Sequence, residues 1–151
     1  MLFEQLEDFK ENIGQNKRLM GIDFGQARIG IAFSDEGGMI STPFETYNRQ
    51  NINKDLGYIN RLIKERNLSG IVIGLPLELD GTESQNCQII RDFVKKLQKK
   101  TYIAIFLQDE RMSTAAVTRV LMQTDMTRKK RQSVDDKLAA SYILQGVLDR
   151  M

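Results

Sequence analysis

The spacing of apolar positions changes after about residue 50. Before that point the chain has short extended segments rich in apolar residues, and after it helical spacing alternates with short apolar runs. Strands are predicted at residues 19–24, 29–33, 39–47, 71–73 and 102–107. Helices are predicted at residues 1–17, 53–68, 82–99, 113–123 and 133–148, with a basic linker at 127–132.

The order of these elements predicts a mixed sheet. The first three strands are separated by turns that contain glycine, which indicates an antiparallel meander. The later strands alternate with helices, which favours parallel pairing through right-handed crossovers. We therefore expect a ribonuclease H-like α/β domain over residues 18–151, with five strands flanked by helices, preceded by an N-terminal extension over residues 1–17.

Composition narrows the possible chemistry. The 151 residues include one cysteine, Cys87, and no histidine, which excludes Ser-His-Asp and Cys-His catalysis and the usual zinc sites. An enzyme with this composition must use Asp, Glu, Lys, Tyr or a metal-bound water. No apolar run approaches the roughly 20 residues that span a bilayer, and the N-terminus lacks a signal-peptide core. A cytoplasmic protein without membrane contact is expected.

Asp23 is an acid inside the first strand, which should be central and buried. A buried, unpaired carboxylate costs several kcal/mol, so this one must be hydrogen-bonded, paired or metal-bound. The structural alternative is a salt bridge to Arg28 or Arg111. Acids in central strands more often mark a functional site.

Two further groups of acids fall at the ends of elements. Asp109 and Glu110 follow the last strand. They either belong to a functional site or simply begin a loop, with Ser113 as the N-cap of the next helix. Asp136 lies near the start of the last predicted helix, where it could form a capping box with Ser133. Capping does not exclude catalysis, since packing of that helix on the sheet would bring Asp136 towards Asp23.

Carboxylates from two strands and one helix could thus converge. Oxygen ligands without His or Cys select Mg²⁺ or Mn²⁺, and two such ions about 4 Å apart would promote phosphodiester hydrolysis. Nearby cations could contact phosphate groups. These candidates are Arg28, Arg111 and the run Arg128, Lys129, Lys130 and Arg131, which is otherwise a solvated loop.

Four sequence blocks carry a family resemblance. They are DFGQARIGIAFSD from Asp23, GLPLELDGTE from Gly74, DERMST from Asp109, and VDDKLAA from Val134 followed by ILQ. Their order and content resemble the YqgF family, described as Holliday junction resolvases and as pre-16S rRNA nucleases, over about residues 18–150. The resemblance implies a ribonuclease H-like fold, Mg²⁺- or Mn²⁺-dependent nuclease activity in 5′-end maturation of small-subunit ribosomal RNA, and Asp23, Glu110 and Asp136 as catalytic acids and metal ligands.

One position departs from the family pattern, and the substrate stays open. Ala27 replaces the lysine that usually precedes the arginine of the first block, so that contact would pass to Arg28 or to residues 128–131. Structured RNA is the expected partner, and branched DNA is the alternative. A junction resolvase needs two active sites and hence a dimer, so both monomer and homodimer remain open. The third hypothesis is a non-catalytic nucleic-acid-binding factor.

Overall fold

The chain folds around a six-stranded sheet in the order β1-β6-β5-β2-β3-β4. The computed structural model describes residues 1–77, 80–110 and 128–151, except for the side chains of 128–135. The strands are β1 Leu2–Phe3, β2 Leu19–Phe24, β3 Arg28–Ser34, β4 Ser41–Asn48, β5 Gly70–Leu75 and β6 Ala104–Asp109. The described helices are α1 Leu6–Ile13, α2 Ile52–Glu65, α3 Gln85–Gln98 and α5 Arg128–Leu148.

The predicted meander and the predicted parallel portion are both confirmed. Strands β2, β3 and β4 pair antiparallel in sequence order. Strand β2 pairs parallel with β5, and β5 pairs parallel with β6. The carboxyl ends of β2, β5 and β6 therefore lie along one edge of the sheet, where open α/β sheets usually place their ligands.

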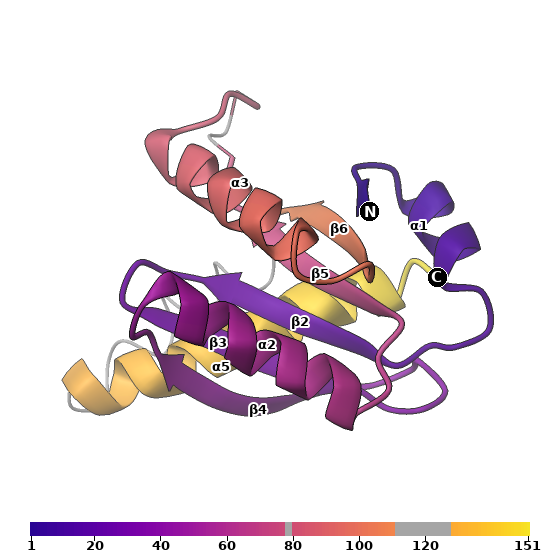
Figure 1. The fold of residues 1–151 in the computed structure, drawn as a ribbon, viewed down its shortest axis with the longest axis horizontal. Helices are drawn as coiled ribbons and strands as arrows, with labels where there is room; N and C mark the ends of the chain where they lie inside the picture. The colour runs from indigo at the N-terminus through magenta and orange to yellow at the C-terminus, as the bar shows by residue number, and fades with distance from the viewer. Residues whose placement is uncertain (78–79, 111–127) are drawn as a thin grey trace.

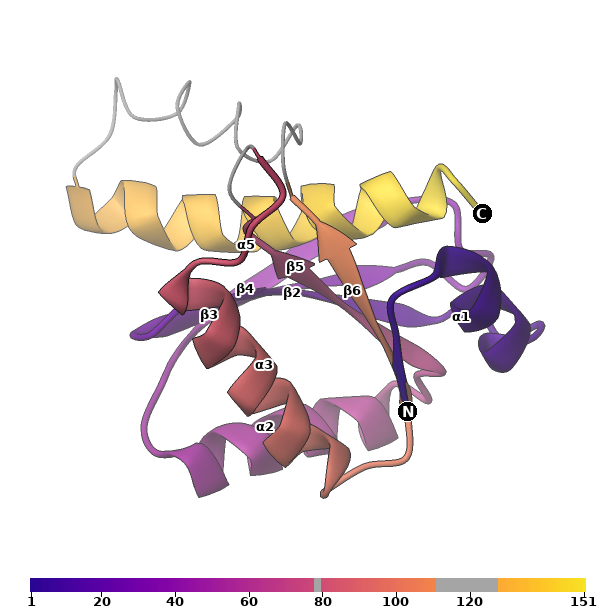
Figure 2. The ribbon, with the colours of Figure 1, turned by 90° about the horizontal axis from the view of Figure 1, so that it is seen from above.

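Helices cover both faces of the sheet (Figures 1 and 2). Helices α2 and α3 pack on one face, and α5 crosses the other. Each face has its own core, since side chains alternate across a strand: the first core includes Ile22, Ile73 and Phe93, and the second includes Val72 and Leu144. None of the described helices is both long enough and apolar enough to cross a membrane.

The sheet has six strands rather than the five predicted. The additional strand is β1, which pairs parallel with β6 through Leu2 and Phe3. Helical spacing of apolar residues was predicted over 1–17, but α1 spans only Leu6–Ile13. A strand of two residues is too short for its alternation to be distinguished from the first turn of a helix.

The last helix begins earlier than predicted. Because α5 starts at Arg128, the basic run that was expected in a linker belongs to the first turn of the helix. Arg, Lys and Gln are good helix formers, and neither Gly nor Pro interrupts the segment. Asp136 is therefore in the third turn of α5, so the predicted capping box with Ser133 is wrong. The predicted helix at 113–123 lies outside the described residues.

Candidate active site

Asp23 stands between two glycines of neighbouring strands, on the sheet face that α5 covers. On β3, Gly30 is its antiparallel partner, and a Cβ at Gly30 would overlap the backbone carbonyl of Asp136 in α5. Directly opposed residues project to the same face, so the side chain of Asp23 faces α5. Gly21, two residues earlier, faces the same way, since a Cβ there would stand 2.6 Å from the carbonyl oxygen of Ala140.

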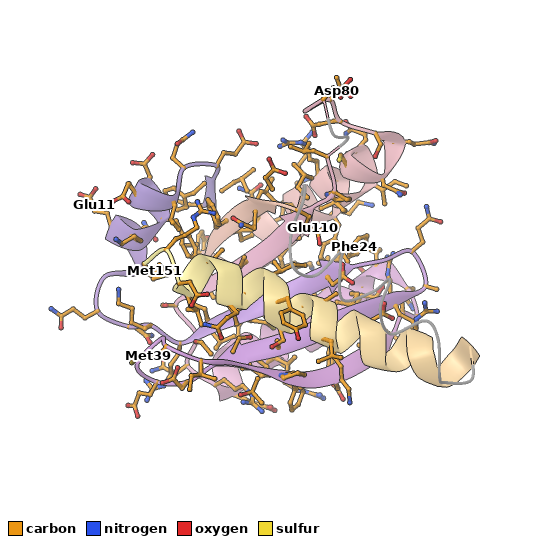
Figure 3. All side chains as sticks on the ribbon, turned by 180° about the vertical axis from the view of Figure 1, so that it is seen from behind. Glu11, Phe24, Met39, Asp80, Glu110 and Met151 are labelled. Carbon is orange, nitrogen blue, oxygen red and sulfur yellow. The ribbon has the colours of Figure 1, made fainter. Side chains whose placement is uncertain are left out.

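Glu110 approaches the same face from the end of β6. Its backbone N–H donates to the Leu75 carbonyl at 3.1 Å, and its side chain is 9% exposed. A Cβ on Gly74 would lie 2.5 Å from Cδ of Glu110 and 2.7 Å from Cδ1 of Ile143 in α5. The Glu110 carboxylate therefore lies over Gly74. Figure 3 shows Glu110 at the same end of the sheet as Phe24, the residue after Asp23.

The Glu110 carboxylate lies over β5, which stands between its own strand β6 and the strand β2 that carries Asp23. The parallel register pairs Ile22 with Ile73, so Asp23 and Gly74 follow one residue later on β2 and β5. Neighbouring strands are about 4.8 Å apart. Gly74, Asp23 and Gly30 thus form a row across three strands, and the two glycines leave room for Glu110 on one side and for the backbone of α5 on the other. Neither Asp23 nor Glu110 is without an interaction partner.

Asp136 reaches this row from α5 and forms an ion pair with Arg28. Nε of Arg28 donates to Oδ2 of Asp136 at 2.7 Å, with both side chains partly buried. Arg28 was predicted to contact substrate phosphate or to neutralise Asp23. The structure instead places its guanidinium against the third predicted acid.

The three predicted acids share one sheet face but do not form a closed metal site. Among the residues with described side chains, no three Asp, Glu, His or Cys groups come close enough together to hold one ion. The chemistry of the donors fits Mg²⁺ or Mn²⁺, because all three supply carboxylate oxygen. In the described structure Asp136 is engaged with Arg28.

A buried network on the other face of the sheet supports the turn that follows Asp23. Asp55 of α2 is fully buried and accepts hydrogen bonds from Arg49 Nε at 2.9 Å and from the Tyr47 hydroxyl at 2.9 Å. The Arg49 guanidinium donates onward to the carbonyls of Gly25 and Gln26. The turn between Asp23 and Arg28 is thereby fixed to α2.

Asp55 keeps its charge despite its burial. Burial alone would raise the pKa of its carboxyl, but the Gln50 N–H, the Arg49 guanidinium and the Tyr47 hydroxyl together hold that pKa below its ordinary value. Burial and the adjacent carboxylate raise the pKa of Tyr47. This network was not predicted from the sequence. The available signal was an acid at position 55 on the apolar side of the helix, beside Leu56 and Ile59.

The remaining predicted phosphate contacts have different outcomes. Arg28 is described and lies at the site. Arg111 lies outside the described residues. The backbone of residues 128–131 forms the first turn of α5, and their side chains also lie outside the described part of the chain.

Comparison of the sequence with known proteins gives full-length matches. Residues 17–150 match the family model described as RuvX, Holliday junction resolvase. A protein of Ruegeria sp. (strain TM1040), named "putative pre-16S rRNA nuclease", is 43% identical over 151 residues, covering 100% of this chain and 96% of the relative. A protein of Anaplasma marginale with the same name is 42% identical over 149 residues, covering 99% and 95%. The resemblance found in the four blocks is confirmed.

Comparison of the structure supports the predicted fold. Thermus thermophilus RuvC, solved in complex with a Holliday junction substrate, superposes with a TM-score of 0.55 at 10% sequence identity, covering 89% of this chain and 96% of that one. At this identity the likeness concerns the fold, which is ribonuclease H-like.

Proposed function

Because the chain belongs to the RuvX family of Holliday junction resolvases, we propose that it is a metal-dependent nuclease that cleaves phosphodiester bonds in the 5′-end maturation of pre-16S rRNA. The names of its full-length relatives support this substrate. We place the enzyme in the cytoplasm with its ribosomal substrate.

The row formed by Gly74, Asp23 and Gly30 is the observation that carries the proposal. It brings the carboxylate of Asp23 on β2 beside that of Glu110, which lies over Gly74 of β5, at the carboxyl edge of the sheet, and it places the backbone of Asp136 against Gly30 of β3. A packing role would favour apolar side chains at these central positions. Carboxylates there repel one another, which lowers stability unless a cation balances them.

Asp23, Glu110 and Asp136 would hold Mg²⁺ or Mn²⁺. One or two ions bound there would supply an activated water and neutralise the charge on the leaving oxygen. The protein contributes the fixed positions of Asp23 in β2 and of Glu110 at the end of β6, with β5 between the two strands. It also contributes Arg28, whose ion pair with Asp136 holds this carboxylate at the edge of the site.

Cations around these acids would bind the substrate backbone. We assign this role to Arg28, Arg111, Arg128, Lys129, Lys130 and Arg131. Arg28 forms an ion pair with one of the acids. The other four described positions, 128–131, form the first turn of α5, the helix that also contains Asp136. Lys and Arg that neutralise phosphates make binding dependent on salt.

A junction-resolving DNA endonuclease is the second candidate. The description of the matched family and the shared fold with a RuvC bound to a Holliday junction favour it. The same acids would perform the same chemistry, but symmetric cleavage of a junction requires two sites and therefore a dimer.

The test compares the two substrates directly. The purified chain is incubated with a pre-16S rRNA 5′ fragment or with a four-way DNA junction, each with Mn²⁺ and with EDTA. The proposal predicts Mn²⁺-dependent cleavage of the RNA. Paired, symmetric cleavage of the junction alone would support the resolvase, and binding without cleavage of either substrate would support a non-catalytic factor.

A further inference from the structure

The end of α3 and the loop after it carry a basic surface far from the acids. Lys95, Lys96, Lys99 and Lys100 are exposed, and the ring of Tyr102 is 99% exposed. We refer to these five residues as the α3 basic patch. The patch lies where β6 begins, whereas Glu110 follows the end of β6, and Figure 2 shows these two ends of β6 on opposite sides of the molecule.

The backbone of the patch is fixed. The N–H groups of Lys100 and Thr101 donate to the carbonyl of Leu97, which is fully buried, at 2.9 and 3.1 Å. Next, the Ile103 N–H donates to the Thr101 hydroxyl at 3.2 Å, and the N-terminal ammonium of Met1 donates to the Ile103 carbonyl at 3.1 Å. The lysines and Tyr102 are thus presented from the last turn of α3 and the hydrogen-bonded loop after it, with the N-terminal charge beside that loop.

Positive charge is concentrated on this layer of the fold. Residues 52–66 and 85–100, which form α2, α3 and their ends, contain nine Lys and Arg but only three Asp and Glu, a net charge of +6 in a chain of net +2. Where the structure describes side chains, no carboxylate forms an ion pair with a lysine of the patch. The surplus makes this layer attractive to a polyanion.

The exposed tyrosine distinguishes this surface from an ordinary helix end. Lysines near a helix C-terminus are favoured by the helix dipole, which accounts for Lys95 and Lys96. That effect does not account for Tyr102, whose ring stabilises nothing in the fold while fully exposed. Aromatic rings next to cations form the stacking platforms on which single-stranded nucleic acids bind.

We propose that the α3 basic patch is a second RNA-binding site, which holds the substrate backbone while an unpaired base stacks on Tyr102. This inference rests on the proposed nuclease function. A lipid surface fits less well, because membrane-binding helices expose an apolar face and the apolar residues Phe93, Val94 and Leu97 of α3 are buried.

The position of the patch sets the length of RNA that can use it. Eight residues of extended chain separate Tyr102 from Glu110, which corresponds to about 26 Å. B-form DNA rises about 3.4 Å per base pair and A-form RNA rises less, so about eight to ten base pairs bridge the two sites. Longer substrates would contact both, and shorter ones only the acids.

The test uses full-length protein and RNA fragments with the same cleavage site, one with about five flanking base pairs and one with more than twelve plus a single-stranded end. Binding is measured by fluorescence anisotropy in EDTA at several KCl concentrations, and cleavage is measured in Mn²⁺. The patch variant replaces Lys95, Lys96, Lys99 and Lys100 with Gln. A second pair of variants is Tyr102→Ala and Tyr102→Phe, the latter retaining the ring. Lys10→Gln with Lys17→Gln serves as a charge control outside the basic layer, matched to Lys99→Gln with Lys100→Gln, which removes the same charge within the patch.

We expect the patch variant to bind the long RNA at least tenfold more weakly, with a salt slope reduced by about three. Tyr102→Ala should weaken binding about tenfold, and Tyr102→Phe should restore it. Cleavage of the short RNA should be unchanged in all of these variants. Wild-type affinity and slope for the long RNA in the patch variant would overturn the proposal, as would equal losses in the charge control. If wild type cleaves neither RNA, the nuclease function fails, whereas binding that depends on the patch would still support this site.

Discussion

The guanidinium of Arg28 holds the carboxylate of Asp136 at 2.7 Å, joining the start of β3 to the third turn of α5. Asp136 is thereby neutralised at the edge of the row that contains Asp23. A cation entering the site and the guanidinium of Arg28 would compete for the same carboxylate. Arg28 therefore sets how readily the third acid joins the other two.

Replacing Arg28 with Gln should raise the affinity for Mn²⁺. Removing the positive charge of Arg28, a few ångströms from the acids, should strengthen Mn²⁺ binding by about 1 kcal/mol, which is roughly fivefold in affinity. Isothermal titration calorimetry with Mn²⁺ measures the change in the absence of RNA. Arg150→Gln removes an equal charge at the far end of the chain and should leave the affinity unaltered. Equal or weaker Mn²⁺ binding by Arg28→Gln would show that the two cations do not compete.

Gly30 should not tolerate a side chain. The Cβ of Gly30→Ala would overlap the backbone of Asp136, so α5 must shift from the sheet, at a cost of about 1–3 kcal/mol in the free energy of unfolding. The matched change is Gly57→Ala in α2, where a Cβ meets nothing within 4 Å. That variant should be stabilised by about 0.5–1 kcal/mol. Urea denaturation gives both values, and equal stabilities would argue against close packing of α5 at Gly30.

Loss of the Asp55 charge should destabilise the fold. Asp55→Asn leaves the partly buried Arg49 without its counter-ion, which costs about 2–3 kcal/mol, below the cost for a fully buried pair. Glu11→Gln, at an exposed acid of α1, should cost almost nothing. Unfolding in urea at pH 7 compares the three proteins. A loss no larger than that of the control would mean that the network adds little to stability.

The effect of Asp55 should also depend on pH. Its folded-state pKa is lowered, so as the pH falls the unfolded chain takes up a proton at this group before the folded chain does. Its contribution is complete above the ordinary aspartate pKa of about 4 and is lost as the pH falls through the folded-state pKa. The stability gap between wild type and Asp55→Asn should therefore narrow below pH 4. Hydrogen bonds from the Ile40 and Met39 N–H groups also lower the pKa of Asp35. Asp35 is present in both proteins, so its contribution cancels in the difference. A gap that is constant from pH 7 to pH 3 would contradict this assignment.

Much of the fold could be predicted because its elements have distinct periods. The meander of β2, β3 and β4 and the parallel pairing of β5 and β6 follow from the spacing of apolar residues. Strand β1 could not be predicted, since two residues carry no period and their pairing with β6 is a long-range contact. The start of α5 was placed too late because a run of basic residues suggests a solvated loop, although the same residues are good helix formers.

The site could be predicted in part. Asp23 and Glu110 were identified from their places in and after strands, and the glycine contacts put both on one face. The pairing of Arg28 with Asp136 could not be foreseen, because it joins residues 108 positions apart. The support of the Asp23 turn by Arg49 and Asp55 was not predicted although these two residues are close in sequence, since it depends on how α2 packs beneath the sheet.

Substitution of Asp23 by Asn distinguishes a catalytic role of this carboxylate from a structural one. The variant keeps the size and shape of the side chain but loses the charge, so the chain should remain folded and at least as stable, because repulsion with Glu110 is relieved. Cleavage of the pre-16S rRNA fragment is measured in Mn²⁺, with circular dichroism and urea unfolding as the check on folding. We expect a folded, RNA-binding protein with no detectable cleavage. Cleavage at the wild-type rate would contradict this expectation, and an unfolded variant would show that Asp23 serves the structure.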